Sequence, residues 1–327
     1  MKTAPLRLFC LSASAELGAG LSAALAEPLA AHEERDFEDG EHKARPLDSV
    51  AGADVYVVQS LHGGPQQSAN DKLCRLLFFI GAIKDAGAAR VTAVTPYLCY
   101  ARKDRRTKPN DPVTTRYIAG MFESVGTDCV VTLEVHNPVA FENAFRCRTV
   151  ALSGTPLFVD YAKGLADQRL SVISPDAGGM KRAEQLRESL EATLGRPVGK
   201  GLAEKHRSAG VVSGDLFVGD VAGTTALIVD DLVSTGKTLL SAARSARKAG
   251  ATRVIALVTH GLFMQGAAEV VADPAIDQVV ITDSVPPFRL EHQTGNNKLV
   301  ILPVAPLLAE TIRRLHEDRS LTDLGVS

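Results

Sequence analysis

The sequence predicts an α/β fold of two tandem domains, each built on a mainly parallel sheet flanked by helices. Short apolar, β-branched runs alternate with helix-period segments along the 327 residues, which requires crossover connections between parallel strands. A chain of this length is about two domains long. In addition, residues 86–94 are identical to residues 249–257 at six of nine positions, although 163 residues separate the two segments.

Each copy of this echo reads as a helix end, a glycine suited to the left-handed C′ position, and the start of a strand. Such junctions look alike in many α/β proteins, which is the conservative explanation. Because the spacing is half the chain, we favour a duplicated domain. The expected domains are 1–150 and 151–305, and a final helix at about 306–318 is expected to return to the first domain.

The individual strands and helices are assigned from the pattern of apolar residues. Strands are assigned to apolar, β-branched runs, and helices to the amphipathic segments between them. The expected strands are Leu6–Leu11, Val55–Gln59, Val91–Thr95, Cys129–Leu133, Leu170–Ser174, Ala226–Asp230, Val254–Thr259, Gln278–Thr282 and Leu299–Leu302. The expected helices are Ala15–Glu27, Ser68–Ala86, Pro112–Val125, Pro156–Ala166, Gly179–Leu194, Gly236–Lys248 and Pro306–His316.

Composition narrows the class of protein. The chain carries 36 Lys and Arg against 38 Asp and Glu, and this balance disfavours a general nucleic-acid binder. Trp is absent, so platforms that stack single-stranded bases are scarce. No apolar run approaches the ~20 residues that cross a bilayer, and the N-terminus does not read as a signal peptide. We expect a cytoplasmic protein without membrane or nucleic-acid partners, whose five cysteines are free thiols.

The clearest chemical motif closes the predicted strand Ala226–Asp230. Two adjacent acids, Asp230 and Asp231, end the strand, and a small hydroxyl-rich turn leads into a helix. A helix N-terminus presents unpaired amides and partial positive charge, which suit a phosphate, while neighbouring carboxylates suit two hydroxyls of a ribose ring. The turn consists of Ser234, Thr235, Gly236, Lys237 and Thr238, with the glycine allowing close backbone approach.

This turn is not a nucleoside-triphosphate P-loop. The pattern G-x-x-x-x-G-K-[ST] requires a glycine where this chain has Asp231. The simpler explanation is a helix cap beside two solvated acids. We favour the sugar-phosphate interpretation.

Three other segments carry charge near predicted strand ends. Tyr100–Arg106 places four cations within five residues, which suits a polyanion; a solvated loop is the alternative, but α/β sites lie at the carboxyl ends of strands. In Ser174–Gly179, Asp176 precedes a glycine turn whose backbone amides can bind an anion. The simpler alternative is that Asp176 is only a helix N-cap. The polar stretch Ala203–Gly210, which contains Lys205-His206-Arg207, is expected to be an exposed loop.

Two acids followed by a Thr/Gly turn resemble the ribose-5-phosphate loop of the type I phosphoribosyltransferase fold. Further stretches are similar to one family of that fold, ribose-phosphate diphosphokinase, also called phosphoribosyl pyrophosphate synthetase. They follow the family's order over nearly the whole chain, and the family also resembles two fused copies of one domain. The stretches are Asp39–Glu41, Tyr97–Arg105, Leu133–His136, Ser174–Gly179 and Ala305–Glu310.

The resemblance implies an activity, the transfer of pyrophosphoryl from Mg-ATP to the 1-hydroxyl of ribose 5-phosphate with Mg²⁺ as cofactor. Lys205 and Arg207 match a mobile catalytic loop that stabilises the transferring group, since such reactions depend on positioning and electrostatics. The implied ATP site contains Phe37, Asp39, Glu41, Arg102, Lys103, Asp104 and His136, of which the first three come from a neighbouring subunit. His136 and Asp176 match metal ligands, and Asp230, Asp231, Ser234, Thr235, Gly236, Lys237 and Thr238 match the ribose-5-phosphate site.

Departures from the family pattern keep other functions open. Glu134 stands for the usual Asp, His206 for a frequent Arg, and Lys237 for a common Gly. A non-catalytic regulatory paralogue is therefore one alternative, and a phosphoribosyltransferase acting on a base is another. A plain sugar- or nucleotide-binding module is a third. The resemblance also implies a homodimer or homohexamer with active sites near subunit interfaces.

Overall fold

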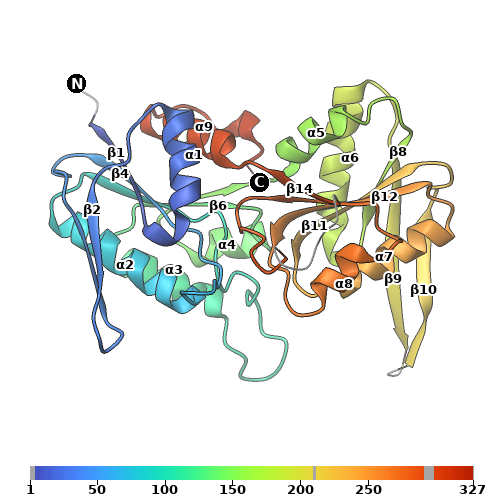
Figure 1. Ribbon diagram of the computed structural model, residues 1–327, viewed down its shortest axis with the longest axis horizontal. Helices are drawn as coiled ribbons and strands as arrows, with labels where there is room; N and C mark the ends of the chain where they lie inside the picture. The colour runs from blue at the N-terminus through green and yellow to red at the C-terminus, as the bar shows by residue number, and fades with distance from the viewer. Residues whose placement is uncertain (1–3, 209–210, 291–297, 327) are drawn as a thin grey trace. The chain divides into compact units, whose positions relative to one another are not determined.

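The computed structural model describes residues 4–208, 211–290 and 298–326 (Figure 1), with the backbone alone for 204–208 and 211–216. The chain divides into two compact units. The first unit comprises Met1–Ser153 with Val304–Ser327, and the second comprises Gly154–Pro303.

The first unit contains a five-stranded sheet of order β1-β4-β5-β6-β7, in which every neighbouring pair is parallel. A separate antiparallel hairpin, β2–β3, lies between β1 and β4 in the chain. The strands are β1 (Leu6–Cys10), β2 (His32–Asp36), β3 (His42–Pro46), β4 (Asp54–Val58), β5 (Arg90–Val94), β6 (Cys129–Leu133) and β7 (Arg148–Leu152). The helices are α1 (Ala15–Leu25), α2 (Ala69–Asp85), α3 (Thr114–Ser124), α4 (Pro138–Ala144) and α9 (Ala305–His316).

The second unit contains a seven-stranded sheet of order β10-β9-β8-β11-β12-β13-β14. All neighbours are parallel except the edge pair β9–β10, which forms an antiparallel ribbon (Figure 1). The strands are β8 (Leu170–Ser174), β9 (Gly199–Ser208), β10 (Val211–Gly219), β11 (Thr225–Val233), β12 (Arg253–Gly261), β13 (Gln278–Thr282) and β14 (Leu299–Leu302). The helices are α5 (Thr155–Lys163), α6 (Met180–Leu194), α7 (Lys237–Lys248) and α8 (Ala267–Ala272).

The two units share one hydrogen bond between a strand amide and an aspartate side chain. In the first, Asp128 Oδ2 accepts a hydrogen bond from Val91 N at 2.7 Å, and in the second Asp277 Oδ2 accepts one from Val254 N at 2.6 Å. Val91 and Val254 are equivalent positions of the sequence echo. The preceding glycines, at 87 and 250, have φ of +90° and +98°, which favours glycine at both positions. The fold prediction of two tandem α/β domains is confirmed.

Two helices pack in a different unit from the strand that precedes them in the chain. Helix α5 follows β7 in the chain but packs on α6 in the second unit, and α9 follows β14 but packs on α1 in the first. An arginine helps to fix each of these two helices, and it is the first residue of β5 in the first unit and of β12 in the second. Arg90 Nη2 donates to Leu315 O at 2.9 Å, while Arg253 Nη2 donates to Gln278 Oε1, which also accepts from Tyr161 of α5.

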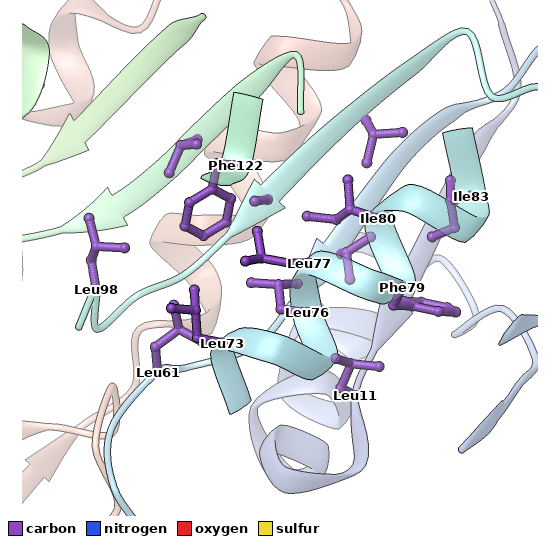
Figure 2. Packing of buried hydrophobic residues seen from close by; sticks show 14 of the residues in the cluster. Leu11, Leu61, Leu73, Leu76, Leu77, Phe79, Ile80, Ile83, Leu98 and Phe122 are labelled. Atoms are coloured by element: carbon purple, nitrogen blue, oxygen red, sulfur yellow. The ribbon is translucent and has the colours of Figure 1, made fainter. Parts of the chain in front are cut away.

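The inner strands of both sheets are buried on two faces, as is typical of parallel sheets covered by helices. In β11, Ala226 and Ile228 join the core beneath α7 and α8, whereas Leu227 and Val229 join the core beneath α5 and α6. In the first unit, the apolar face of α2 packs against β-strand side chains and α3 (Figure 2). The residues labelled there include Leu73, Leu76, Leu77, Ile80, Ile83 and Phe122.

Every strand and helix predicted from the periodicity is present, with small shifts at the ends. The expectation of an exposed loop at Ala203–Gly210 is wrong for residues 203–208, which belong to β9. Beyond Leu202, β9 pairs with β10 but not with β8. Main-chain pairing with β10 therefore forms this strand despite its polar sequence. Residues 209 and 210 lie outside the described part of the chain.

Candidate functional site

The turn from β11 to α7 is fixed by hydrogen bonds from the segment that follows β12. Val233 O accepts hydrogen bonds from the amides of Leu262 (3.0 Å) and Phe263 (3.1 Å), and Ser234 O accepts one from Met264 (2.9 Å). Gly236 has φ +76°, and a Cβ there would lie 2.8 Å from Val270 Cγ1. A side chain at position 236 is therefore excluded both by the backbone conformation and by α8.

The start of α7 suits a phosphate. Gly236 is the N-cap residue and has no side chain to accept from the first helical amides, and the first turn contains no acid. Thr235, Lys237 and Thr238 are exposed around this end. None of the Ser234, Thr235 and Thr238 hydroxyls hydrogen-bonds to another residue that the structure describes. Amides, hydroxyls and one cation thus surround the positive end of the helix dipole.

The two acids precede this turn on β11. Asp231 is nearly buried, with 7% of its side chain exposed, and Asp230 retains 23%. Asp230 Oδ1 accepts a hydrogen bond from the Asp231 amide at 2.9 Å. Burial, followed by repulsion from the neighbouring Asp231 carboxylate, raises the pKa of Asp230 to about 8. The ionised pair is consequently costly without a cationic or hydrogen-bonding partner.

Arg182 of α6 supplies such a cation, and the sequence motifs gave no sign of it. Its Nη1 lies 3.6 Å from Asp230 Oδ1 and its Nη2 lies 4.0 Å from Asp231 Oδ2. Arg182 falls in the first turn of α6, just beyond the Ser174–Gly179 motif. The nearest sequence signal was therefore that motif, but only the packing of α6 shows that the side chain reaches β11.

Asp176 lies in the connection between β8 and α6. Its Oδ1 accepts a hydrogen bond from Gly179 N at 3.1 Å, so it is the N-cap of the short 3₁₀ turn Ala177–Gly179. The residue is exposed, and this turn contacts β11. β8 and β11 are parallel neighbours. Asp176 follows the end of β8 and the two acids lie near the carboxyl end of β11, so all three are at the same edge of the sheet. The helix-cap role and a ligand role are compatible, because a carboxylate has two oxygens.

The cation-rich segment of the first unit is organised around Asp111. The Asp111 Oδ2 atom accepts from Lys103 Nζ (2.6 Å), from Thr107 Oγ1 (2.7 Å) and from two backbone amides. These contacts, led by the hydrogen bond from Lys103, hold the pKa of Asp111 well below its ordinary value. Lys103 is thereby engaged within the loop. Arg102 is exposed and forms no hydrogen bond or ion pair with another described residue.

Asp104 connects this segment to the end of β6. Asn137 Nδ2 donates to Asp104 Oδ2 at 2.6 Å, while Asn137 Oδ1 caps α4 by accepting from Ala140 N. His136, the preceding residue, is exposed. Glu134 has φ +45°, and its amide donates to Leu152 O at 2.7 Å. The structure therefore brings the predicted residues Arg102, Asp104 and His136 to one group of connected loops in the first unit.

Phe37, Asp39 and Glu41 form the tip of the β2–β3 hairpin. The Phe37 amide donates to Glu41 O, and Asp39 Oδ1 accepts from the Glu41 amide at 3.0 Å. The Phe37 ring is 39% exposed, with the Arg35 guanidinium 5.2 Å from its centre. An exposed aromatic ring beside two acids is available to a molecule from outside the unit.

For two other predicted residues, Lys205 and Arg207, the structure describes the backbone only. Lys205 and Arg207 belong to β9, where their backbones pair with Asp215 and Val212 of β10. Their side chains fall outside the described residues. His136 and Asp176 belong to different units.

The donor set fits Mg²⁺ delivered with a polyphosphate. Among the side chains that the structure describes, no group of three metal-ligating residues is present. Mg²⁺ commonly uses one or two carboxylates together with waters and substrate phosphates, so no protein cage is required. The exposed Asp176 carboxylate, one oxygen of which is not used by the Gly179 amide, meets this requirement.

The tandem parallel sheets flanked by helices place the chain in the phosphoribosyltransferase fold class. Residues 6–126 match the N-terminal domain of ribose phosphate pyrophosphokinase, and residues 212–325 match the phosphoribosyl synthetase-associated domain. The chain belongs to the ribose-phosphate pyrophosphokinase family of enzymes, as the sequence predicted.

Full-length relatives support this assignment. The chain is 36% identical to ribose-phosphate pyrophosphokinase of Caldanaerobacter subterraneus subsp. tengcongensis, over 98% of each chain. It is 34% identical to ribose-phosphate pyrophosphokinase of Hyphomonas neptunium, over 98% of this chain and 99% of the relative. The crystal structure of phosphoribosylpyrophosphate synthetase from Mycobacterium smegmatis matches with a TM-score of 0.85 and 31% identity, covering 96% of this chain and 99% of that one. No described helix has the length and apolar character needed to cross a bilayer.

Proposed function

We propose that this chain transfers the β,γ-pyrophosphoryl group of Mg-ATP to the 1-hydroxyl of ribose 5-phosphate, giving phosphoribosyl pyrophosphate and AMP. The observation that carries the proposal is the N-terminus of α7, which lacks a side-chain cap and is joined by a short turn to the strand that carries the two acids. A 5-phosphate suits the helix end, and vicinal hydroxyls suit the carboxylates, so one turn can hold both ends of the sugar.

The reaction is an in-line displacement at the β-phosphorus. The 1-hydroxyl oxygen forms a bond to phosphorus and loses its proton, while the bond from phosphorus to the oxygen bridging to the α-phosphate breaks. Asp230 and Asp231 orient the sugar, and the turn Ser234–Thr238 anchors its phosphate. Because such a transition state needs little covalent help, positioning and charge dominate catalysis.

The nucleotide is assigned to the loops of the first unit. Arg102 contributes an exposed guanidinium, and Lys103 and Asp104 shape the loop that carries it. Phe37, Asp39 and Glu41 bind adenine for a neighbouring copy in a homodimer or homohexamer. Lys205 and Arg207 close over the phosphates and stabilise the transferring group.

Mg²⁺ bound to the triphosphate offsets the charge that would repel an incoming oxygen nucleophile. Asp176 and His136 would hold it. Asp176 would supply a carboxylate oxygen, the ligand type that this hard cation prefers, and His136 would supply a ring nitrogen from the loop after β6.

The test is product identification with purified protein, ATP, ribose 5-phosphate and Mg²⁺, and no nucleobase. We expect equal amounts of AMP and phosphoribosyl pyrophosphate by mass spectrometry. No product from the isolated chain, with activity restored by adding a catalytic relative, would favour the regulatory paralogue. Turnover only after a base and phosphoribosyl pyrophosphate are supplied would favour a phosphoribosyltransferase.

A further inference from the structure

Arg182 stands between the first turn of α6 and the acid pair on β11. Only 14% of its side chain is exposed, and its two terminal nitrogens face different carboxylates, 3.6 Å from Asp230 Oδ1 and 4.0 Å from Asp231 Oδ2. One guanidinium thus spans both acids. A planar fork can do this, whereas a lysine ammonium is a point charge.

The lengths of these contacts matter for the chemistry. Both exceed the 2.7–3.2 Å of an N–H···O hydrogen bond. The guanidinium therefore offsets the charge of the two carboxylates without closing a short bond to either of these oxygens. A ligand hydroxyl can donate to a carboxyl oxygen that is held in a fixed position.

Another arginine of α6 pairs with acids of its own helix. Arg187, on the same helix, makes short bonds of 2.6 Å to both Glu184 and Glu191 and is 16% exposed. Arg187 is thus satisfied by its own helix. Arg182 instead reaches from α6 to the neighbouring strand, at the point where the sugar-phosphate turn begins.

We propose that Arg182 is a positioning residue for the sugar, which orients Asp230 and Asp231 so that they read the vicinal hydroxyls of ribose 5-phosphate. This rests on the proposed function and extends it to specificity. The enzyme would distinguish ribose 5-phosphate from 2-deoxyribose 5-phosphate through the acid pair, because the deoxy sugar lacks one of the hydroxyls that donate to the two acids.

The experiment compares Arg182→Met and Arg182→Lys with wild type and with Arg187→Met as the matched control. Binding of ribose 5-phosphate, 2-deoxyribose 5-phosphate and ATP is measured by calorimetry, with Tm recorded for each variant. For Arg182→Met we expect ribose 5-phosphate to bind roughly 10- to 100-fold more weakly. Binding of 2-deoxyribose 5-phosphate should weaken much less, so the preference for ribose shrinks, while ATP binding is retained.

The two controls separate positioning from folding. Arg182→Lys keeps the charge but loses the fork, so it should recover part of the affinity and of the preference for ribose. Arg187→Met is expected to lower Tm and leave the sugar preference intact. If Arg182→Met does not fold, Arg182→Lys alone must show the reduced ribose preference.

The outcomes that overturn the inference are distinct from failure of the proposed function. An unchanged ribose preference in both Arg182 variants would overturn it. So would a fall in kcat at unchanged KM for ribose 5-phosphate, because Arg182 would then act on the transferring group. Failure of the wild-type chain to form phosphoribosyl pyrophosphate would instead remove the proposed function, and the binding data would still report on Arg182.

Discussion

Gln59 and Asp230 occupy the same position in the two sheets. Each follows a residue that lies opposite an equivalent position of the repeated segment, Val58 opposite Val94 in the first unit and Val229 opposite Leu257 in the second. The Gln59 side chain is fully buried, and its side-chain carboxamide forms no hydrogen bond with another described residue. An acid in one copy of the domain is therefore a neutral amide in the other.

The helix that follows differs in the same sense. Helix α2 of the first unit begins with a capping box, in which Ser68 and Asp71 satisfy each other's amides. Helix α7 begins at Gly236 without a side-chain cap. A phosphate at the start of α2 would meet the Asp71 carboxylate, so we assign the sugar phosphate to the second unit alone.

Replacing Asp231 tests whether the acid pair binds ribose 5-phosphate and not ATP. Asp231→Asn should weaken ribose 5-phosphate roughly 10- to 100-fold, because a nearly buried carboxylate loses charge-assisted hydrogen bonds to the sugar. Binding of ATP should change little. Calorimetry with each ligand separately measures both effects, and equal weakening of the two ligands would contradict the division.

Asp230 should show a trade between stability and function. Its raised pKa means that the folded state keeps a proton which the unfolded state loses above pH ~4, so stability falls as pH rises towards 8. Asp230→Asn removes this loss. We expect it to raise Tm by roughly 2–4 °C at pH 8.5 and by less at pH 5, while weakening sugar binding.

The control for this variant is Asp220→Asn, at an exposed acid of the same unit. It should leave the pH dependence of Tm unchanged. A gain from Asp230→Asn that is the same at pH 5 and pH 8.5 would show that the carboxyl does not titrate as described.

Lys205 is tested by separating kcat from KM. If it stabilises the transferring group, Lys205→Ala should lower kcat on the order of 10²–10³-fold and change KM for ribose 5-phosphate far less. Lys200→Ala, at an exposed lysine on the same strand β9, is the control and should retain activity. An effect on KM alone would remove Lys205 from the transition state.

Arg102 is expected to act on the nucleotide. Arg102→Ala should raise KM for ATP roughly tenfold through loss of a charge-assisted contact to the phosphates, with KM for ribose 5-phosphate retained. Arg116→Ala, at an exposed arginine of α3, is matched in chemistry and should have little effect. Steady-state kinetics with each substrate varied distinguish the two, and identical behaviour of both variants would refute the assignment.

Asp54 is predicted to stabilise the first unit by fixing α9. Its carboxylate accepts from Arg90 at 2.6 and 2.7 Å and faces His316 Nδ1 at 2.8 Å. Burial opposes ionisation, but the hydrogen bonds from Arg90 and then His316 hold the pKa of Asp54 below its ordinary value. Asp54→Asn breaks a buried ion pair and should cost about 3–5 kcal/mol at pH 7.

The pH dependence of that deficit has a definite sign. A depressed carboxyl pKa stabilises the fold above pH ~4 and loses this contribution as pH falls through the folded-state value, so the deficit should shrink at pH 3. Asp318→Asn removes the exposed partner of Arg90 and should cost less than about 1 kcal/mol. Denaturant unfolding at both pH values measures this, and equal losses from the two variants would be inconsistent with it.

Sequence periodicity predicted the parallel cores because their strands are apolar on both faces. It did not predict the β2–β3 hairpin, since His32–Asp36 is entirely polar or charged and shows no alternation. It also missed β7, α4, β9, β10 and α8. These elements are either short or form through main-chain pairing, which leaves little side-chain pattern.

For the site, local chemistry was readable and long-range contacts were not. The Asp230–Thr238 turn could be recognised because acids, hydroxyls and glycine are consecutive in the chain. Arg182 lies nearly fifty residues earlier and reaches the acids only through packing of α6 against the sheet. The bond between Lys103 and Asp111 closes within one loop, but a run of cations does not reveal it either.

The most direct test of sugar-phosphate binding is a crystal structure with ribose 5-phosphate and a non-hydrolysable ATP analogue. It should show the 5-phosphate on the first amides of α7 and two ribose hydroxyls on the carboxylates of Asp230 and Asp231. A sugar bound elsewhere, with this turn empty and both acids directed away from the ligand, would contradict the account.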